Sequence, residues 1–401
     1  MNLPDAPWQR SGDMRRLLAT LGAADGDTRF VGGCVRDTLL GIPVADVDLA
    51  TRLLPEEVMR RLKEAGIKAV PTGLAHGTVT AVIRGKPVEV TTLRRDVSTD
   101  GRRATVAFTD DWREDAGRRD FTINALNADP ESGEIFDYFG GLDDLEARRV
   151  RFIGDALTRI AEDHLRILRF FRFHARFGEG EPDPEGLDAC TRRANDLMAL
   201  SRERIAGELL RLLALPDPAP TLRIMVERGI LAPVLPEIDR SGVDRLAALP
   251  ARERSAEVPA DGVRRFAALL PPGQLAVDLA ARLRLSNAQR ARLECIERGE
   301  PDNALPPRQL AYRIGAECAV DRLLLDDRFD AEEAADRIAS LASWQRPDLP
   351  VRGGDLVTAG VTAGPDVARL LRRIEERWIG EDFPDAARAR EIMAEELRRG
   401  A

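Results

Sequence analysis

Histidine and cysteine are scarce in this chain of 401 residues, and each scarcity excludes certain kinds of functional site. Three histidines, at positions 76, 164 and 174, are too few for a histidine-based metal hydrolase. The four cysteines form no C-x-x-C and no zinc-ligand spacing, which favours free thiols and a reduced, cytoplasmic setting. Because no run of about 18 apolar residues exists, we expect no membrane span.

The charge balance is the next limit. The net charge is −8 with 32% charged residues, which argues against a protein that coats nucleic acid non-specifically. An acidic body can still carry a local basic cleft for one selective RNA partner. A hydrophobic content of 44% supports real cores, and the length suffices for two to four domains. No protein partner is evident from the sequence.

The stretch Arg29–Ala50 holds the features around which the chain is organised. A strand ending at Val31 is followed by Gly32 and Gly33, whose missing side chains let a ligand approach the backbone. Val35–Leu40 then predicts a short helix, and Arg36 on it supplies a charge for a phosphate group. Neither G-x-G-x-x-G nor G-K-[ST] is present, so the turn is neither a dinucleotide fingerprint nor a Walker loop.

Two aspartates follow the short helix. Val44–Leu49 alternates like a strand, so Asp46 and Asp48 are expected on one face of it. Two carboxylates this close repel each other unless a cation lies between them, which predicts a metal site. Glu89, on the strand expected at Pro87–Leu93, is either a third carboxylate of that site or an exposed strand residue.

Three further segments are rich in arginine. Arg94–Ala107 predicts a polar loop, either simply solvated or able to close on a triphosphate. The run RRDFTINALNAD brings Arg118, Arg119, Asp120 and Asn124 to the start of an apolar helix, for which the simpler reading is a capped helix with surface charge. The helix expected at Ala161–Phe177 carries a stripe of arginines within about 120° of its surface. An all-arginine stripe more often meets phosphate than a mixed face does.

The motifs GGCVRD, DVD, RRDFTINA and EDHLRILR resemble those of the bacterial CCA-adding enzyme and poly(A) polymerase family, the class II nucleotidyltransferases. The resemblance runs through most of the chain. It implies an α+β fold, with a small mixed β-sheet in a nucleotidyltransferase head followed by an all-helical neck, body and tail. The corresponding divisions are residues 1–148 for the head, 149–215 for the neck, 216–305 for the body and 306–401 for a tRNA-binding tail.

The resemblance also implies roles for particular residues. Asp46 and Asp48 would bind two Mg²⁺ ions. Glu89 is counted with these catalytic residues only from its place on the strand, as the possible third carboxylate. Asp163 and Arg166 would read the base of the nucleotide. The remaining nucleotide-binding residues, which would contact the ribose and triphosphate, are Gly32, Gly33, Arg36, Arg118, Arg119, Asp120, Asn124, Arg169 and Arg172.

The activity implied is template-independent addition of CMP and AMP, from CTP and ATP, to the tRNA 3′ end. Poly(A) polymerase is the alternative within the enzyme class, because it shares every motif. The mixed C-terminal helix AARAREIMAEELRRGA favours CCA addition, since poly(A) polymerases of the family often end in a long basic extension. A nucleotide- or RNA-binding protein that has lost catalysis is the alternative of another class, and the presence of both aspartates argues against it.

Overall fold

The computed structural model of the chain describes residues 1–99, 104–271, 273, 276–299 and 301–400. Contacts divide the chain into two compact units. The first comprises Met1–Leu212 with Pro220–Pro236, and the second comprises Leu213–Ala219 with Glu237–Ala401. The four-part division expected from the sequence is finer than this one and stays a prediction.

A mixed β-sheet forms the centre of the first unit. Its strand order is β3-β4-β5-β2-β1-β8-β9, in which β2 and β5 pair in parallel and the other neighbours are antiparallel. The expected α+β fold class with a mixed sheet is therefore confirmed, and the sheet has seven strands. The strands are β1 (Thr28–Val31), β2 (Asp48–Thr51), β3 (Lys68–Gly73), β4 (Thr78–Ile83), β5 (Lys86–Thr92), β8 (Asn127–Ala128) and β9 (Ile135–Phe136). The last two have two residues each, too few to show alternation in a sequence.

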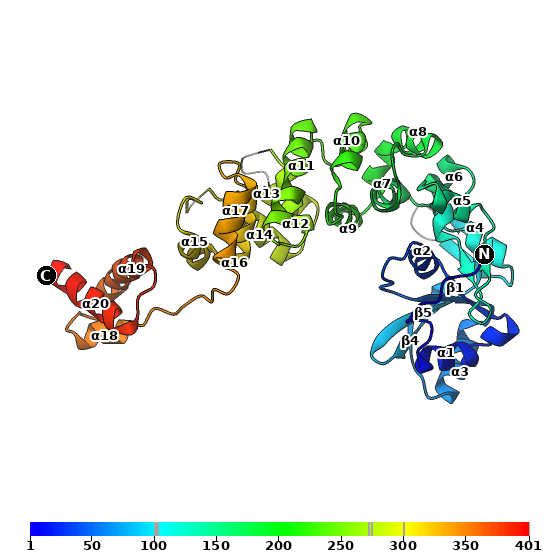
Figure 1. The fold of residues 1–401 in the computed structure, drawn as a ribbon, viewed down its shortest axis with the longest axis horizontal. Helices are drawn as coiled ribbons and strands as arrows, with labels where there is room; N and C mark the ends of the chain where they lie inside the picture. Colours follow the sequence, from blue (N-terminus) through cyan, green and yellow to red (C-terminus); the bar gives the residue numbers. More distant parts are fainter. Residues whose placement is uncertain (100–103, 272, 274–275, 300, 401) are drawn as a thin grey trace. The chain divides into compact units, whose positions relative to one another are not determined.

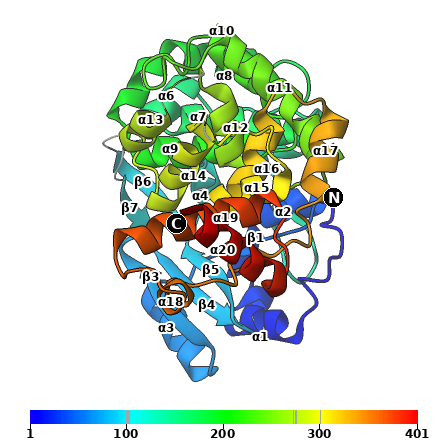
Figure 2. The same ribbon diagram turned by 90° about the vertical axis from the view of Figure 1, so that its left-hand side faces the viewer.

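Helices α1 and α3 lie on one side of this sheet (Figures 1 and 2). Helix α1 forms where Ser11 accepts a hydrogen bond from the Met14 amide, and it buries Met14, Leu17 and Leu18 at helical spacing. The helices of the head are α1 (Gly12–Thr20), α2 (Gly33–Leu39), α3 (Pro55–Glu64), α4 (Trp112–Gly117) and α5 (Gly141–Glu146), with a 3₁₀ turn η3 at Thr122–Asn124.

Two expectations about strands and loops are corrected. Strand β2 begins at Asp48 and not at residue 44, so Asp46 lies in the segment before the strand. The alternation of a strand therefore does not determine which way the Asp46 side chain points. The arginine-rich segment expected as a loop is largely an antiparallel hairpin of β6 (Arg94–Thr99) and β7 (Ala104–Phe108). Residues 100–103, which belong to the predicted loop, lie outside the described residues.

The helical neck also differs from expectation at one point. The single helix predicted over Ala161–Phe177 is two helices, because the chain leaves helical geometry at Asp163 with φ −152° and ψ 106°. The neck helices are α6 (Ala156–Glu162), α7 (Arg166–Phe177), α8 (Pro184–Arg192) and α9 (Arg202–Leu213). Helix α10 (Ala219–Glu227) follows, in the division expected for the body. Phe121 of the head packs against Phe152, Phe170 and Phe173, with ring centroids 5.0 to 6.3 Å apart, so head and neck share one aromatic core.

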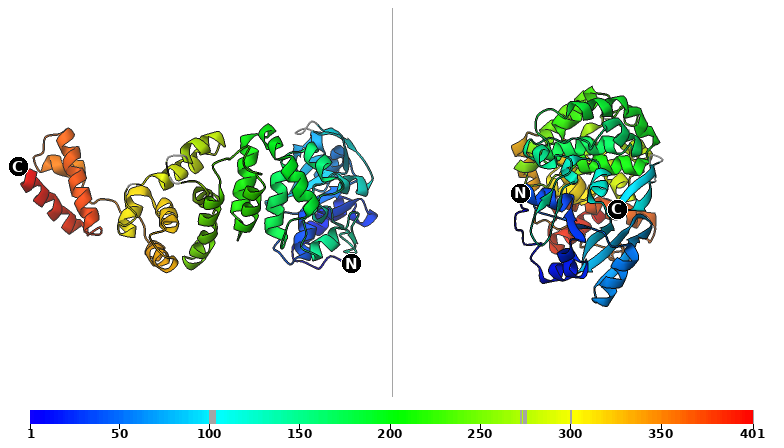
Figure 3. Two further views of the ribbon diagram at one scale, coloured as in Figure 1. Left: turned by 90° about the horizontal axis from the view of Figure 1, so that it is seen from above. Right: turned by 90° about the vertical axis from the view of Figure 1, so that its right-hand side faces the viewer.

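The second unit contains helices and no strand among its described residues. Tyr312 and Trp378 belong to the apolar core around α19 and α20, which lie side by side (Figures 1 and 3). Its helices are α11 (Arg240–Ser255), α12 (Gly262–Leu269), α13 (Ala276–Arg282), α14 (Asn287–Glu297), α15 (Pro307–Ile314), α16 (Ala316–Leu325), α17 (Ala331–Ala339), α18 (Gly353–Thr358), α19 (Pro365–Gly380) and α20 (Ala386–Gly400). None of the helices in the described part of the chain has the length and apolar character needed to cross a membrane.

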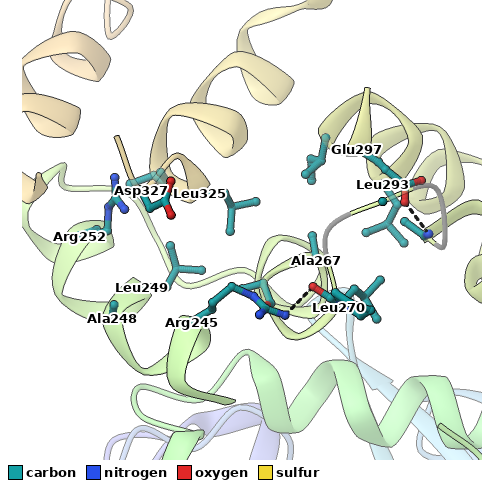
Figure 4. A pocket seen from close by; sticks show the side chains of 16 residues that line it. Arg245, Ala248, Leu249, Arg252, Ala267, Leu270, Leu293, Glu297, Leu325 and Asp327 are labelled. Carbon is teal, nitrogen blue, oxygen red and sulfur yellow. Dashed lines mark hydrogen bonds between the residues drawn. The ribbon is translucent and has the colours of Figure 1, made fainter. Parts of the chain in front are cut away.

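A largely apolar cavity of about 480 Å³ lies among the helices of the second unit. Arg245 lines it and donates to the Leu270 carbonyl at 2.7 Å, so this guanidinium is already engaged with the protein's own backbone (Figure 4). None of the candidate site residues lines this cavity.

Two of the four cysteines are paired. Cys295 and Cys318 form a disulfide between α14 and α16, with Cα atoms 6.3 Å apart. The expectation of four free thiols is wrong for this pair, because helix packing brings together cysteines that are 23 residues apart. Cys34 and Cys190 are free and buried, and burial raises the pKa of the Cys34 thiol to about 11.

Candidate active site

A cavity of about 350 Å³ in the first unit is lined entirely by residues that the sequence motifs single out. They come from the glycine turn and the first part of α2, from the start of β2, from the segment after α4, from the break after α6, and from α7. The eleven lining residues are Gly32, Gly33, Arg36, Asp48, Arg118, Arg119, Asp120, Asn124, Asp163, Arg166 and Arg169. Five arginines against three aspartates give the lining an excess of positive charge, which favours an anionic ligand.

The glycine turn admits an arginine to this cavity. Gly32 caps α2 with φ 69° and ψ −122°, a backbone region that residues with side chains avoid. A Cβ at Gly32 would lie 2.7 Å from Nη1 of Arg119. The Arg119 guanidinium therefore occupies the space that any side chain at position 32 would need.

Arg119 keeps much of its hydrogen-bonding capacity. Its Nη1 donates to the Asn124 carbonyl at a long 3.4 Å, and its Nη2 lies 3.7 Å from Asp115. Its Nε is buried and has no hydrogen-bond partner among the described residues. A buried donor without a hydrogen bond costs free energy of folding, so this group is suited to donate to an acceptor on a ligand.

Arg36 is held more firmly. Its Nε and Nη2 donate to Asp37 at 2.8 and 2.7 Å, and its Nη1 donates to the Asn124 side chain. The guanidinium also lies 4.1 Å from the centroid of the Phe177 ring. Burial lowers the pKa of Arg36, and the charge of Asp37 partly offsets this effect.

Asp120 joins the head to the neck. Its carboxylate accepts from Arg169 Nε at 2.7 Å, from the Asn124 amide group at 2.9 Å and from the Phe121 amide at 2.9 Å. Burial alone would raise the pKa of Asp120, but the Arg169 charge and these hydrogen bonds outweigh it and lower the pKa. Asp120 therefore fixes Arg169 and Asn124 on two sides of the cavity.

Of the two predicted metal ligands, Asp46 and Asp48, and the possible third carboxylate Glu89, only Asp48 lines the cavity. Asp48 lies at its edge, and Glu89 of β5 pairs with Asp48 in the parallel register. Burial raises the pKa of Asp48, and the negative charges of Glu89 and Asp46 add to the shift while Arg119 opposes it. Within the described ranges no three histidine, cysteine or acidic side chains are close enough to hold a metal ion by themselves.

The base-reading pair has a different geometry from the one expected. Asp163 lies in the break between the helices and Arg166 begins α7, so the two are not on successive turns of one helix. Both Asp163 oxygens accept from Nη2 of Arg204 on α9, at 3.0 and 2.8 Å. Arg166 donates to Glu162 and, at 3.0 Å, to the Arg118 carbonyl. Both side chains nevertheless line the cavity.

Arg172 does not line the cavity, and its expected contact with the nucleotide finds no support in the geometry. Its Nε donates to the buried Glu208 of α9 at 2.6 Å, and burial lowers the pKa of Arg172. Arg176 lies 3.9 Å from Asp37. The arginine stripe of α7 is thus matched by carboxylates from other elements, which the sequence of α7 alone does not reveal.

Three side chains that position the site were not singled out from the sequence: Asp115, Arg204 and Glu208. Asp115 precedes Arg118 and Arg119 by three and four residues, a helical spacing that predicts ion pairs. Arg204 and Glu208 are four apart and so share a face of α9. The sequence offers no comparable signal that pairs Arg204 with Asp163 or Glu208 with Arg172, because these partners are 41 and 36 residues apart.

Two family models match the head and part of the helical region, and known relatives match most of the chain. Residues 28–151 match the poly A polymerase head domain, and residues 181–241 match the probable RNA and SrmB-binding site of polymerase A. The chain is 33% identical to the human mitochondrial CCA tRNA nucleotidyltransferase 1 over 88% of its length and 82% of that protein. It is 32% identical to the CCA-adding enzyme of Lacticaseibacillus paracasei, covering 92% of each chain.

Solved structures agree with this. The crystal structure of the Bacillus stearothermophilus CCA-adding enzyme in complex with CTP is 29% identical and matches with a TM-score of 0.76, over 97% of this chain and 99% of that one. The Thermotoga maritima CCA-adding enzyme complexed with tRNA has the same fold, with a TM-score of 0.68 at 21% identity over 96% of this chain and 94% of that one. The chain belongs to the family of CCA-adding enzymes and poly(A) polymerases.

Proposed function

We propose that this protein adds CMP and AMP, from CTP and ATP, to the 3′ end of tRNA without a template and releases pyrophosphate. The observation that carries the proposal is the arginine-rich cavity beside Asp48, whose size and charge suit a nucleoside triphosphate. Relatives similar over most of this chain are CCA-adding enzymes, which supports tRNA as the RNA substrate.

In this proposal Asp46 and Asp48 hold two Mg²⁺ ions. The raised pKa of Asp48, caused by burial and by the nearby Glu89 and Asp46 charges, fits a position where a cation would relieve repulsion. When bound, the metal would lower the pKa of the RNA 3′-hydroxyl and stabilise charge on the α-phosphate. Glu89, paired in register with Asp48, adds a third negative charge at that edge.

The arginines hold and orient the triphosphate. Arg119 offers the unpartnered Nε, and Arg118 lies next to it in the cavity lining. Arg36 and Arg169 are anchored by Asp37 and Asp120, so their remaining N–H groups are directed without loss of side-chain freedom on binding. Arg172 is left out of this set, because it does not line the cavity and its guanidinium pairs with Glu208.

Asp163 and Arg166 select the base. An ionised aspartate accepts hydrogen bonds and an arginine donates them. Cytosine and adenine each present an exocyclic amine to the carboxylate and a ring nitrogen acceptor to the guanidinium. Uracil and guanine present the reverse polarity and would leave charged groups unsatisfied, which discriminates by roughly 10⁴ or more in sites of this kind.

One experiment separates the candidate functions. Purified protein is given tRNA ending at the discriminator base, tRNA ending in CC, or oligo(A), each with one of the four nucleoside triphosphates. CCA addition predicts CTP use on the first substrate, ATP use on the second, and little extension of oligo(A). Continuous extension of oligo(A) by ATP would instead support a poly(A) polymerase, and nucleotide binding without any transfer would support a non-catalytic protein.

A further inference from the structure

Asp115 occupies a position that none of the motif-based assignments uses. It lies on α4, is 3% exposed, and faces two arginines of the cavity. Its Oδ1 accepts from Nε of Arg118 at 2.9 Å, and its Oδ2 lies 3.7 Å from Nη2 of Arg119. Both arginines follow within four residues, so the helical geometry of α4 directs them to this carboxylate.

The two contacts differ in kind. The Arg118 contact is a charge-assisted hydrogen bond, which fixes the direction of that guanidinium. At 3.7 Å the Arg119 contact is an ion pair without a hydrogen bond, so it orients Arg119 and leaves its N–H groups available. Asp115 also offsets positive charge that would otherwise be crowded in the cavity before a nucleotide binds.

The same carboxylate reaches the β6–β7 hairpin. Its Oδ1 also accepts from the backbone amide of Arg94 at 3.2 Å, and Arg94 is the first residue of β6. Arg118 and the root of the hairpin therefore share one acceptor atom. Through its two oxygens, one buried carboxylate connects the backbone of the hairpin to both arginines.

We propose that Asp115 is a positioning residue that couples the triphosphate-binding arginines Arg118 and Arg119 to the root of the β6–β7 hairpin. This rests on the proposed function, in which those arginines hold the triphosphate. Because of this coupling, the position of the hairpin and the affinity of the site for a triphosphate depend on each other. Binding of a triphosphate, and not of a nucleoside or monophosphate, is then expected to change the protection of the hairpin root.

The test compares Asp115→Asn with Asp111→Asn. The replacement at position 115 keeps an oxygen for the Arg94 amide but removes the charge that faces Arg119. Asp111 is the exposed N-cap of the same helix, and asparagine caps helices equally well, so it is a matched control. Equilibrium affinities for CTP and CMP are measured on the full-length protein, together with hydrogen exchange of the Arg94 amide with and without CTP.

For Asp115→Asn we expect CTP affinity and kcat/KM to fall roughly ten- to a hundredfold, with CMP affinity unchanged. Addition of CTP should no longer protect the Arg94 amide, while Asp111→Asn should behave as wild type in every measurement. If Asp115→Asn has a lowered melting temperature, Asp115→Glu is measured instead, because it keeps the charge at a shifted position. For Asp115→Glu we expect CTP affinity to fall less than in Asp115→Asn, again with CMP affinity unchanged.

Two results would overturn the inference. One is wild-type CTP affinity with unchanged Arg94 protection in the folded variants, and the other is an equal loss of CTP and CMP affinity. Arg119→Ala separates this failure from a failure of the proposed function. If Arg119→Ala loses CTP affinity while both Asp115 variants keep it, the coupling is wrong and the site stands. If Arg119→Ala binds CTP normally, the triphosphate assignment itself is wrong.

Discussion

Replacing Gly32 with alanine tests the geometry of the glycine turn through two effects of known size. The first is backbone strain, because φ 69° with ψ −122° lies in a region that costs a residue with a side chain about 1–3 kcal/mol. The second is steric. The new Cβ would lie 2.7 Å from Nη1 of Arg119, so the guanidinium has to move by about 0.7 Å to reach the 3.4 Å of an ordinary contact.

The two effects have separate readouts. The strain is expected to lower the melting temperature by about 2–4 °C for each kcal/mol in a unit of this size. The displaced Arg119 is expected to lower kcat/KM for CTP by up to about a hundredfold. Differential scanning calorimetry and single-nucleotide addition to tRNA measure them on the same preparation.

Gly33→Ala is the matched control for stability. Gly33 is the first residue of α2 and lacks a positive φ, and its Cβ would lie 3.7 Å from Nη2 of Arg36, an ordinary contact. Alanine there should leave the melting temperature unchanged or raise it, since glycine disfavours helix by roughly 0.5–1 kcal/mol. Equal melting and equal CTP use by Gly32→Ala and wild type would refute the reasoning about the turn.

Three other substitutions test the carboxylates of the site. Asp48→Asn should reduce nucleotide addition by several orders of magnitude. The folded-state pKa of Asp48 is raised, so its ionised form destabilises the native state at pH 7. Asp48→Asn should therefore melt at the same temperature as the wild type or at a higher one. Near-normal turnover of the variant in Mg²⁺ would contradict the metal assignment. Asp163→Ala should raise the use of UTP and GTP relative to CTP and ATP, and unchanged preference would assign base selection to other residues. Asp120→Asn should cost about 1.5–3 kcal/mol in urea unfolding at neutral pH. The folded-state pKa of Asp120 is lowered, so this contribution is present above the unfolded-state pKa of about 3.9 and is lost as the pH falls through the folded-state value; an equal cost at pH 7 and pH 3 would contradict the ion pair.

The sequence predicted the cavity lining well, because its motifs encode local geometry. Gly32 with Arg36, and Arg119 with Asn124, each lie within one turn or helix start, and the fold needs only to bring these short units together. The sequence predicted a small mixed sheet in the head, but it did not predict the two-residue strands β8 and β9. Pairing of β8 with β1, and of β9 with β8, determines those strands, and alternation does not.

The remaining differences arise from long-range contacts. Arg172 was assigned to the nucleotide because its own helix carries no carboxylate, but its partner Glu208 is 36 residues away. Asp163 was placed on the helix of Arg166, yet the chain turns there and Arg204 engages the carboxylate from 41 residues on. Side chains from other elements decide both cases, and no local pattern records them.

The compensated arginines of α7 have a consequence for folding. The ion pair between Asp120 and Arg169, together with the shared aromatic core around Phe121, makes α7 part of the structural support of the head. A fragment that ends at residue 148 would leave Asp120 buried without its guanidinium and Phe121 without Phe170 and Phe173. The head and the neck are therefore expected to melt in one cooperative transition, and a stable fragment has to extend through α9.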